Sequence, residues 1–271
     1  MRRERERIGS CRERTRAYSG VASTGAALSP GPRRSMPGYR TKQETIAIAG
    51  VADLVICSLL DRQQYADADG AAERLGISSA GWPLFGLPWP SGAQLAARLA
   101  LRPVTPGERI LEIGCGLALA SLVAHRRGAD VTASDRHPLT ASFLGANLRL
   151  NGLVPMKYLH GDWASAVDPD DAHEGVARAV AGGRFDLIVG SDILYERDVG
   201  GELAGFIGRH AEAACEVWVV DPDRGNRPAF NRRMADAGFD LSEERLDDPA
   251  TASADAYKGR LLIYRRKLGS H

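Results

Sequence analysis

The chain has 271 residues, of which 44% are hydrophobic and 25% are charged, and its formal net charge is +1. These values are ordinary for a globular protein and exclude a largely disordered or collagen-like chain. The charge is uneven, because residues 1–40 contain ten Arg and three Glu, a net +7 that leaves −6 for the rest. This acidic remainder offers no broad surface for nucleic acid, so nucleic acid is not expected as a partner.

Residues 1–40 are predicted to form a disordered basic tail, because they are rich in Arg, Ser, Gly and Pro and poor in aliphatic side chains. Met36 is an alternative start, since the sequence from there is more ordered in character. A transit peptide and a basic arm for nucleic acid are two further interpretations of the tail. Glu4, Glu6 and Glu13 are atypical of a transit peptide.

Residues 41–104 are predicted to form an N-terminal helical lid segment. Thr41 to Glu44 has the spacing of a capping box, and apolar residues from Ile48 to Leu59 follow at helical spacing, which predicts an amphipathic helix over 42–62. A polar connector over 63–80 comes next, followed by GWPLFGLPWPSG at 81–92, a shaped aromatic loop rich in Gly and Pro. A short helix is expected over 94–101.

Residues 105–271 alternate between strand and helix patterns, which predicts a doubly wound α/β sheet of the Rossmann-like kind. The sheet should be mostly parallel with an antiparallel edge strand, because no helix separates the last two strands. Strands are expected at 109–113, 130–134, 156–160, 185–189, 216–220, 239–246 and 260–264, and helices at 118–127, 138–150, 201–213 and 227–237.

The cysteines and histidines give no sign of a metal site. Cys11, Cys57, Cys115 and Cys215 form no CxxC pair, and the six histidines are scattered, so no metal ligand is predicted. Isolated cysteines fit a reducing compartment, and we expect a cytoplasmic protein. The apolar run over 46–60 is too short to span a bilayer, and no signal peptide or membrane partner is expected.

A glycine turn follows the first strand of the predicted sheet, in the sequence Leu111-Glu-Ile-Gly-Cys-Gly116. Glycines let a ligand approach the backbone, and the following helix offers free N–H groups. The third position of a dinucleotide fingerprint is Leu119 rather than glycine, which argues against a nicotinamide cofactor. Asp135 ends the next strand, where a carboxylate can hold both ribose hydroxyls; capping the next helix is the alternative.

Two further motifs follow later strands. Asp162 and Trp163 could recognise an adenine by hydrogen bonding and stacking, or could form a surface turn. Asp192 and Tyr195 are expected near the crevice at the strand ends, where they could orient an acceptor amine, or could merely cap and pack. Arg224 either lines the acceptor site or pairs with Asp223.

Together these motifs resemble the class I, seven-strand S-adenosylmethionine-dependent methyltransferases, and more narrowly the branch of methyltransferase-like protein-lysine methyltransferases. The resemblance covers about residues 80–265. It depends on WPSG at 89–92, LEIGCGL at 111–117, Asp135, Asn147, GDW at 161–163 and DILY at 192–195. The combination of WPSG, GDW and DILY is more specific than the glycine motif, which many class I enzymes share. Ala118 departs from the third small glycine of the family, which could lower cofactor affinity.

The resemblance implies that residues 105–271 bind S-adenosylmethionine as cofactor. Glu112, Gly114 and Gly116 would contact its methionine part, Asp135 its ribose, Asp162 and Trp163 its adenine, while Trp89 would pack beside it. Asp192 and Tyr195 would face the acceptor as the catalytic pair.

The expected activity is methylation of lysine side chains in a protein. The alternatives are a small-molecule acceptor on the same fold, a non-catalytic cofactor-binding interaction protein, and an oxidoreductase. A nucleophilic role for Cys115 is not expected, because its place in a glycine turn already explains a small residue there. A monomer is favoured.

Overall fold

The computed structural model describes residues 38–164, 183–195, 198, 200–249 and 256–266. By its internal contacts the chain divides into Met1–Arg34 and Ser35–His271, and the architecture below is that of the second unit. The predicted tail over 1–37, with the alternative start at Met36, lies outside the described residues. Within the described part, no helix has the length and apolarity needed to cross a bilayer.

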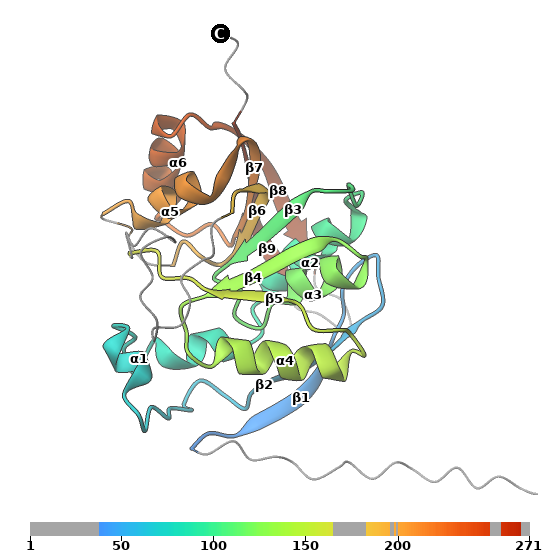
Figure 1. The fold of residues 1–271 in the computed structure, drawn as a ribbon, viewed down its shortest axis with the longest axis vertical. Helices are drawn as coiled ribbons and strands as arrows, with labels where there is room; N and C mark the ends of the chain where they lie inside the picture. The colour runs from blue at the N-terminus through green and yellow to red at the C-terminus, as the bar shows by residue number, and fades with distance from the viewer. Residues whose placement is uncertain (1–37, 165–182, 196–197, 199, 250–255, 267–271) are drawn as a thin grey trace, which may run out of the picture. The chain divides into compact units, whose positions relative to one another are not determined.

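Seven strands of the described residues form one sheet in the order β5-β4-β3-β6-β7-β9-β8 (Figure 1). The five strands from β5 to β7 run parallel, and β9 is antiparallel to both of its neighbours, β7 and β8. The doubly wound, mostly parallel sheet with an antiparallel edge is thereby confirmed, with the reversed strand β9 lying just inside the edge strand β8. The bounds are Arg109–Ile113 (β3), Asp130–Asp135 (β4), Lys157–His160 (β5), Phe185–Ser191 (β6), Ala211–Asp221 (β7), Asp240–Asp248 (β8) and Tyr257–Arg266 (β9).

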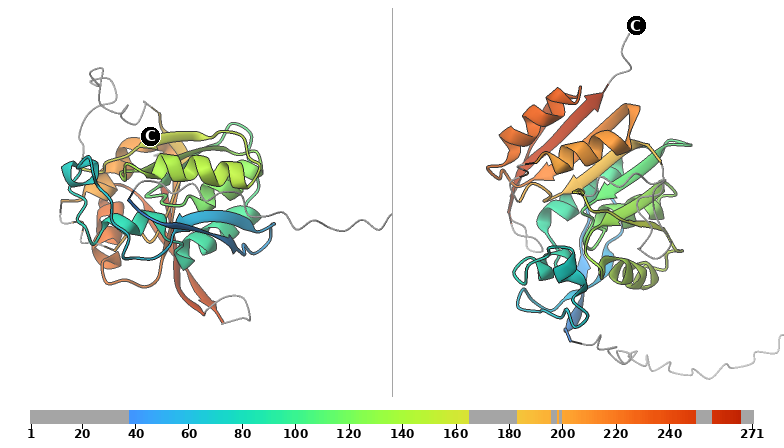
Figure 2. Two further views of the ribbon diagram at one scale, coloured as in Figure 1. Left: turned by 90° about the horizontal axis from the view of Figure 1, so that it is seen from below. Right: turned by 60° about the vertical axis from the view of Figure 1, so that its left-hand side comes forward.

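Helices cover both faces of this sheet (Figures 1 and 2). Successive residues of β3 point to opposite faces, so Ile110 packs with α2, α3 and α4, whereas Leu111 and Ile113 pack with α5 and α6. The helix bounds are Ala71–Arg74 (α1), Pro90–Leu101 (α2), Leu119–Arg126 (α3), Thr140–Leu150 (α4), Glu202–His210 (α5) and Arg227–Asp236 (α6), with a 3-10 helix at Trp82–Gly86 (η1). Two buried cores, one on each face, therefore hold the sheet between them.

The helix predicted over 42–62 is wrong. These residues form an antiparallel hairpin of β1, Thr41–Ile46, and β2, Leu54–Leu59. In β2 burial alternates, with Leu54 and Ile56 fully buried and Val55 exposed, which is the two-residue period of a strand. Gly50, at φ 88°, adopts in the connection a backbone conformation that a helix does not permit.

Asn147 in α4 and Asn151 at its C-terminal cap hold the free edge of this hairpin, which lies beside α4 in Figure 1. Asn151 accepts a hydrogen bond from the Val55 N–H through Oδ1 (3.0 Å) and donates one to the Val55 carbonyl through Nδ2 (2.8 Å). One helical turn earlier, Asn147 Oδ1 accepts a hydrogen bond from the Cys57 N–H (2.8 Å). Alternate residues of the strand edge are thus paired by side chains one helical turn apart.

An aromatic cluster joins the N-terminal segment to the sheet. Trp82, which is 1% exposed, contacts the rings of Tyr39, Phe85 and His137 at centroid distances of 5.7, 5.7 and 5.4 Å. Phe85 also stacks on His137, at 3.7 Å and an interplanar angle of 12°. Because His137 follows β4 directly, these contacts position η1 over the carboxyl ends of the strands.

We expect Asn147→Ala to lower the free energy of unfolding by about 1–3 kcal/mol, because it leaves the N–H of Cys57 without its partner. Arg149→Ala on the exposed side of the same helix is the matched control, and should change stability by less than about 0.5 kcal/mol. Urea unfolding measures both, and hydrogen exchange at the Cys57 amide should quicken in the first variant alone. Equal losses in the two variants would show that the asparagine does not anchor the hairpin.

Candidate functional site

A cavity of about 470 Å³ opens at the carboxyl ends of β3, β4 and β6, where ligands bind in doubly wound sheets. Its walls come from the sheet edge and from the N-terminal segment around η1 and the start of α2. Every predicted site residue lines it: Trp89, Glu112, Gly114, Gly116, Asp135, Asp162, Trp163, Asp192 and Tyr195.

The glycine turn after β3 is shaped by close contacts. Gly114 and Gly116 have φ values of 57° and 51°, in the left-handed region that glycine adopts without strain. A Cβ on Gly116 would lie 2.9 Å from the carbonyl oxygen of Phe85, and one on Gly114 would lie 2.9 Å from Ile193 Cγ2. Ala118, where the resemblance leads us to expect a third glycine, also has a left-handed backbone at φ 59° and is 1% exposed. Glycine is therefore required at 114 and 116.

Two buried carboxylates hold this turn from neighbouring strands. Glu112, at 2% exposure, accepts a hydrogen bond from the Ser121 N–H in the first turn of α3 (2.8 Å). Asp135 accepts one from the Gly116 N–H through Oδ2 (2.9 Å) and one from the His137 N–H through Oδ1 (2.8 Å). Burial raises the pKa of Asp135, and raises the pKa of Glu112 to about 7. The cavity floor thus carries two carboxylates that gain stability from a cationic or hydroxylic ligand.

The two residues after β5 form the next part of the wall. The Trp163 ring lies beside the glycine turn, since a Cβ on Gly114 would be 3.4 Å from Trp163 Cζ2. Asp162 Oδ1 accepts a hydrogen bond from the Ala164 N–H (3.2 Å), which closes a local turn. Asp162 therefore both forms the local turn that was the alternative prediction and lines the cavity.

The aromatic segment supplies the opposite wall. Trp89 is half-buried, donates its indole N–H to the Leu84 carbonyl (2.9 Å) and has the Arg62 guanidinium 5.0 Å from its ring centre. His137 also lines the cavity, and sequence analysis missed it; its place two residues after Asp135 was the available signal. Burial lowers the pKa of His137 to about 3, so this ring stays neutral and acts as a packing surface.

Asp192 lines the cavity and forms an ion pair with Arg224 that the sequence did not reveal. Arg224 Nη2 donates a hydrogen bond to Asp192 Oδ1 (2.8 Å), and the two side chains are 33% and 11% exposed. Burial raises the pKa of Asp192, while a hydrogen bond from Ser91 and the charge of Arg224 oppose that rise. Tyr195, 40% exposed, also lines the cavity.

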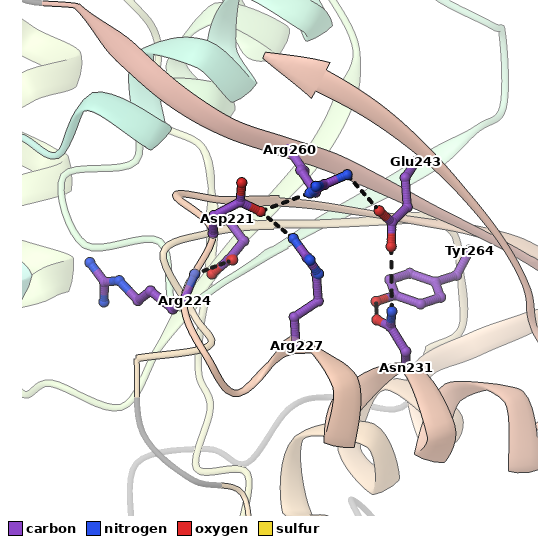
Figure 3. Close-up of polar contacts among 8 residues, drawn as sticks. Asp221, Arg224, Arg227, Asn231, Glu243, Arg260 and Tyr264 are labelled. Atoms are coloured by element: carbon purple, nitrogen blue, oxygen red, sulfur yellow. Dashed lines mark hydrogen bonds and ion pairs between the residues drawn. The ribbon is translucent and has the colours of Figure 1, made fainter. Parts of the chain in front are cut away.

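The alternative pairing of Arg224 with Asp223 is wrong. Asp223 instead pairs with Arg227 and Arg260. Figure 3 shows these two arginines in the network beyond β7. Arg224 therefore lines the cavity, as the other interpretation predicted.

Cys115 sits inside the glycine turn at 8% exposure. Burial and the nearby carboxylates of Asp135 and Glu112 raise the pKa of its thiol well above the usual range. A nucleophilic cysteine needs a lowered pKa, so the environment opposes a catalytic role for this residue.

A doubly wound sheet with a glycine turn after its first strand and a carboxylate after its second defines a class of protein that binds small ligands at its strand ends. Comparison with known proteins narrows the class. The chain is 28% identical over 171 residues to the electron transfer flavoprotein β subunit lysine methyltransferase of Rattus norvegicus, covering 62% of this chain and 60% of the relative. It is 36% identical over 156 residues to the Danio rerio protein of the same name, covering 56% and 55%.

The chain is also 27% identical over 157 residues to the calmodulin-lysine N-methyltransferase of Arabidopsis thaliana, covering 56% of this chain and 50% of the relative. Among solved structures, magnesium protoporphyrin IX methyltransferase from Synechocystis with bound S-adenosylmethionine aligns with a TM-score of 0.47 at 17% identity, over 65% of this chain and 78% of that one. A scan of protein-family models matches none.

These relatives confirm the resemblance to class I S-adenosylmethionine-dependent methyltransferases and to their protein-lysine branch. The chain spans about 55–65% of the length of the first curated relatives that it matches.

The buried Glu112 gives the fold a pH dependence that can be measured. Its pKa is about 7 in the folded protein against an ordinary value of 4.5. The folded state therefore binds the proton more tightly than the unfolded state does. The resulting contribution to the free energy of unfolding is at most about 3 kcal/mol; it is fully present below about pH 4.5 and is lost as the pH rises through about 7.

We expect Glu112→Gln, which keeps an oxygen for the Ser121 N–H but cannot ionise, to lose less stability than the wild type between about pH 5 and 8. Urea unfolding at a series of pH values measures this. Parallel stability curves for the two proteins would contradict a shifted carboxyl at this position.

Proposed function

We propose that the protein is an S-adenosylmethionine-dependent methyltransferase that methylates lysine side chains of a protein. The proposal rests on one observation: a single cavity is lined by the glycine turn, by the two buried carboxylates of Glu112 and Asp135, and by Asp192. The names of the curated relatives, which are lysine methyltransferases acting on proteins, support this choice of acceptor.

The cavity fits the cofactor in size and chemistry. A volume of about 470 Å³ lies within the usual range for small-ligand sites. Gly114 and Gly116 line the cavity, and a Cβ on either would collide with Ile193 or with the Phe85 carbonyl, so glycine keeps the turn close to the cavity's other walls. We assign Glu112, Gly114 and Gly116 to the methionine part, Asp135 to the ribose, Asp162 and Trp163 to the adenine, and Trp89 to packing beside the cofactor. The cofactor supplies a methyl group on a sulfonium sulfur.

The protein's own contribution is to position the acceptor and to exclude water. Asp192 and Tyr195 would contact the acceptor's amino group, with Asp192 orienting it through a hydrogen bond. Holding two reactants in line can account for about 7–11 kcal/mol of a barrier. The aromatic walls around Trp89, Phe85 and Trp163 desolvate the site, which lowers the pKa of a lysine and favours its reactive neutral form.

The remaining assignments follow from this one. Residues 105–271 would be the cofactor-binding core, and residues 41–104, a hairpin followed by η1 and α2, would form the lid that shapes the acceptor site. We propose a cytoplasmic location, which the free thiols of Cys57, Cys115 and Cys215 support. We also propose that the protein is a monomer. A small-molecule acceptor and a non-catalytic binding role are the outcomes that the experiment below separates from protein methylation.

The test is transfer of radiolabelled methyl from S-adenosylmethionine to purified electron transfer flavoprotein β subunit and, in parallel, to a cell extract, with mass spectrometry locating the methyl group. We expect label on a lysine Nζ of a protein. Asp192→Asn should lower kcat/KM by about 10–100-fold, the equivalent of one charge-assisted hydrogen bond. Asp223→Asn, a matched loss of charge in the neighbouring network, should leave the rate close to wild type.

Label in small molecules alone would replace the protein acceptor with a metabolite. Cofactor binding without any transfer would favour the non-catalytic role. Equal rates for Asp192→Asn and Asp223→Asn would remove Asp192 from the acceptor site.

A further inference from the structure

The cavity already contains a cation at the place where the acceptor's amino group is expected. Arg224 and Asp192 both line it, and the guanidinium donates a hydrogen bond to Asp192 Oδ1 at 2.8 Å. Asp192 has a side chain only 11% exposed, so this contact is far less screened than a surface ion pair. Ser91 also hydrogen bonds to this carboxylate.

The backbone of two neighbouring strands sets this pair in place. After β6, Asp192 has a left-handed backbone at φ 57°, and its N–H donates to the Val220 carbonyl in β7 (3.0 Å). After β7, the N–H of Arg224 donates to Asp221 Oδ2 (2.8 Å), a contact drawn in Figure 3. This left-handed backbone is unfavourable for a residue other than glycine, and it holds Asp192 beside Arg224.

The other polar and titratable groups that act on Asp192 supply no second positive charge beside that of Arg224. Tyr257 interacts with it from β9, and burial raises the pKa of that hydroxyl to about 12, so it is neutral. Asp221 interacts with it from β7 and is itself an acid. Ser91 in α2 hydrogen bonds to it without charge. Among the described groups that act on Asp192, Arg224 carries the positive charge.

We propose that Arg224 is a specificity-determining residue: an internal cation that neutralises Asp192, so that the cavity receives the acceptor's amino group in its uncharged form. This rests on the proposed amine acceptor. An unpaired carboxylate within about 4–6 Å would hold an ammonium protonated and raise its pKa by about 1–3 units. With Arg224 in place the ammonium releases its proton to solvent and the freed lone pair on nitrogen is available, while the Asp192 carboxylate accepts an N–H from the neutral amine.

The experiment uses the full chain without cofactor and n-butylammonium, which reproduces the end of a lysine side chain, as the probe. Binding at neutral pH is measured by calorimetry and by NMR shifts. We expect Arg224→Gln, and Arg224→Met as a second neutral variant, to bind the probe about tenfold more tightly than the wild type, the change that one pKa unit represents. Arg224→Lys, which keeps the charge, should bind like the wild type.

Arg227→Gln is the matched control, because Arg227 lies three residues after Arg224 (Figure 3) and pairs with Asp223. It should leave probe binding unchanged, and adding Asp192→Asn to Arg224→Gln should abolish the gain. With a protein acceptor and cofactor, the acid limb of the pH–rate profile should move to higher pH by about one unit in Arg224→Gln.

Equal or weaker probe binding by both neutral variants, an equal gain in Arg227→Gln, or no binding by any variant would overturn the inference. Because the probe experiment contains no cofactor, it stands apart from the methyl-transfer assay: failure of transfer with a clear gain in Arg224→Gln would count against the proposed function alone.

Discussion

The structure depends on a clamp in which two buried carboxylates hold the turn after β3. Glu112 fixes the start of α3 through the Ser121 N–H, and Asp135 fixes Gly116 and His137. Buried carboxylates are costly unless they are hydrogen bonded, so the turn and the carboxylates stabilise each other. The N-terminal segment docks on the same clamp, with the Phe85 carbonyl against Gly116 and its ring on His137.

That docking explains why the cavity is assembled from two distant stretches of sequence. The hairpin is tied to α4 by Asn147 and Asn151, and the aromatic cluster around Trp82 leads from it to η1. The floor of the cavity therefore comes from the sheet, and its opposite wall from residues that precede the sheet in the chain. In the proposed enzyme the first would hold the cofactor and the second would shape access for the acceptor.

Sequence patterns predicted the central strands well because runs such as β3 and β6 are short and apolar and end in turn residues, whereas β8 is mostly polar and exposed. Arg109–Ile113 was predicted to the residue, and the glycine turn and Asp135 fell in the cavity as expected. The hairpin was missed because apolar residues between Ile48 and Leu59 fit a helical period as well as a strand period, and only Gly50 marked the turn. The partner of Arg224 is 32 residues away in the sequence and follows another strand, a separation that no local pattern encodes.

The central claim is that this clamped cavity binds S-adenosylmethionine, and calorimetric titration with S-adenosylhomocysteine tests it most directly. The account predicts saturable binding to the wild type, and the same binding to Asp130→Ala, which removes a carboxylate at the other end of β4. Asp135→Ala, folded by circular dichroism, should lose that binding. A folded wild type that takes up no ligand, or an Asp135→Ala variant that binds as the wild type does, would contradict the account.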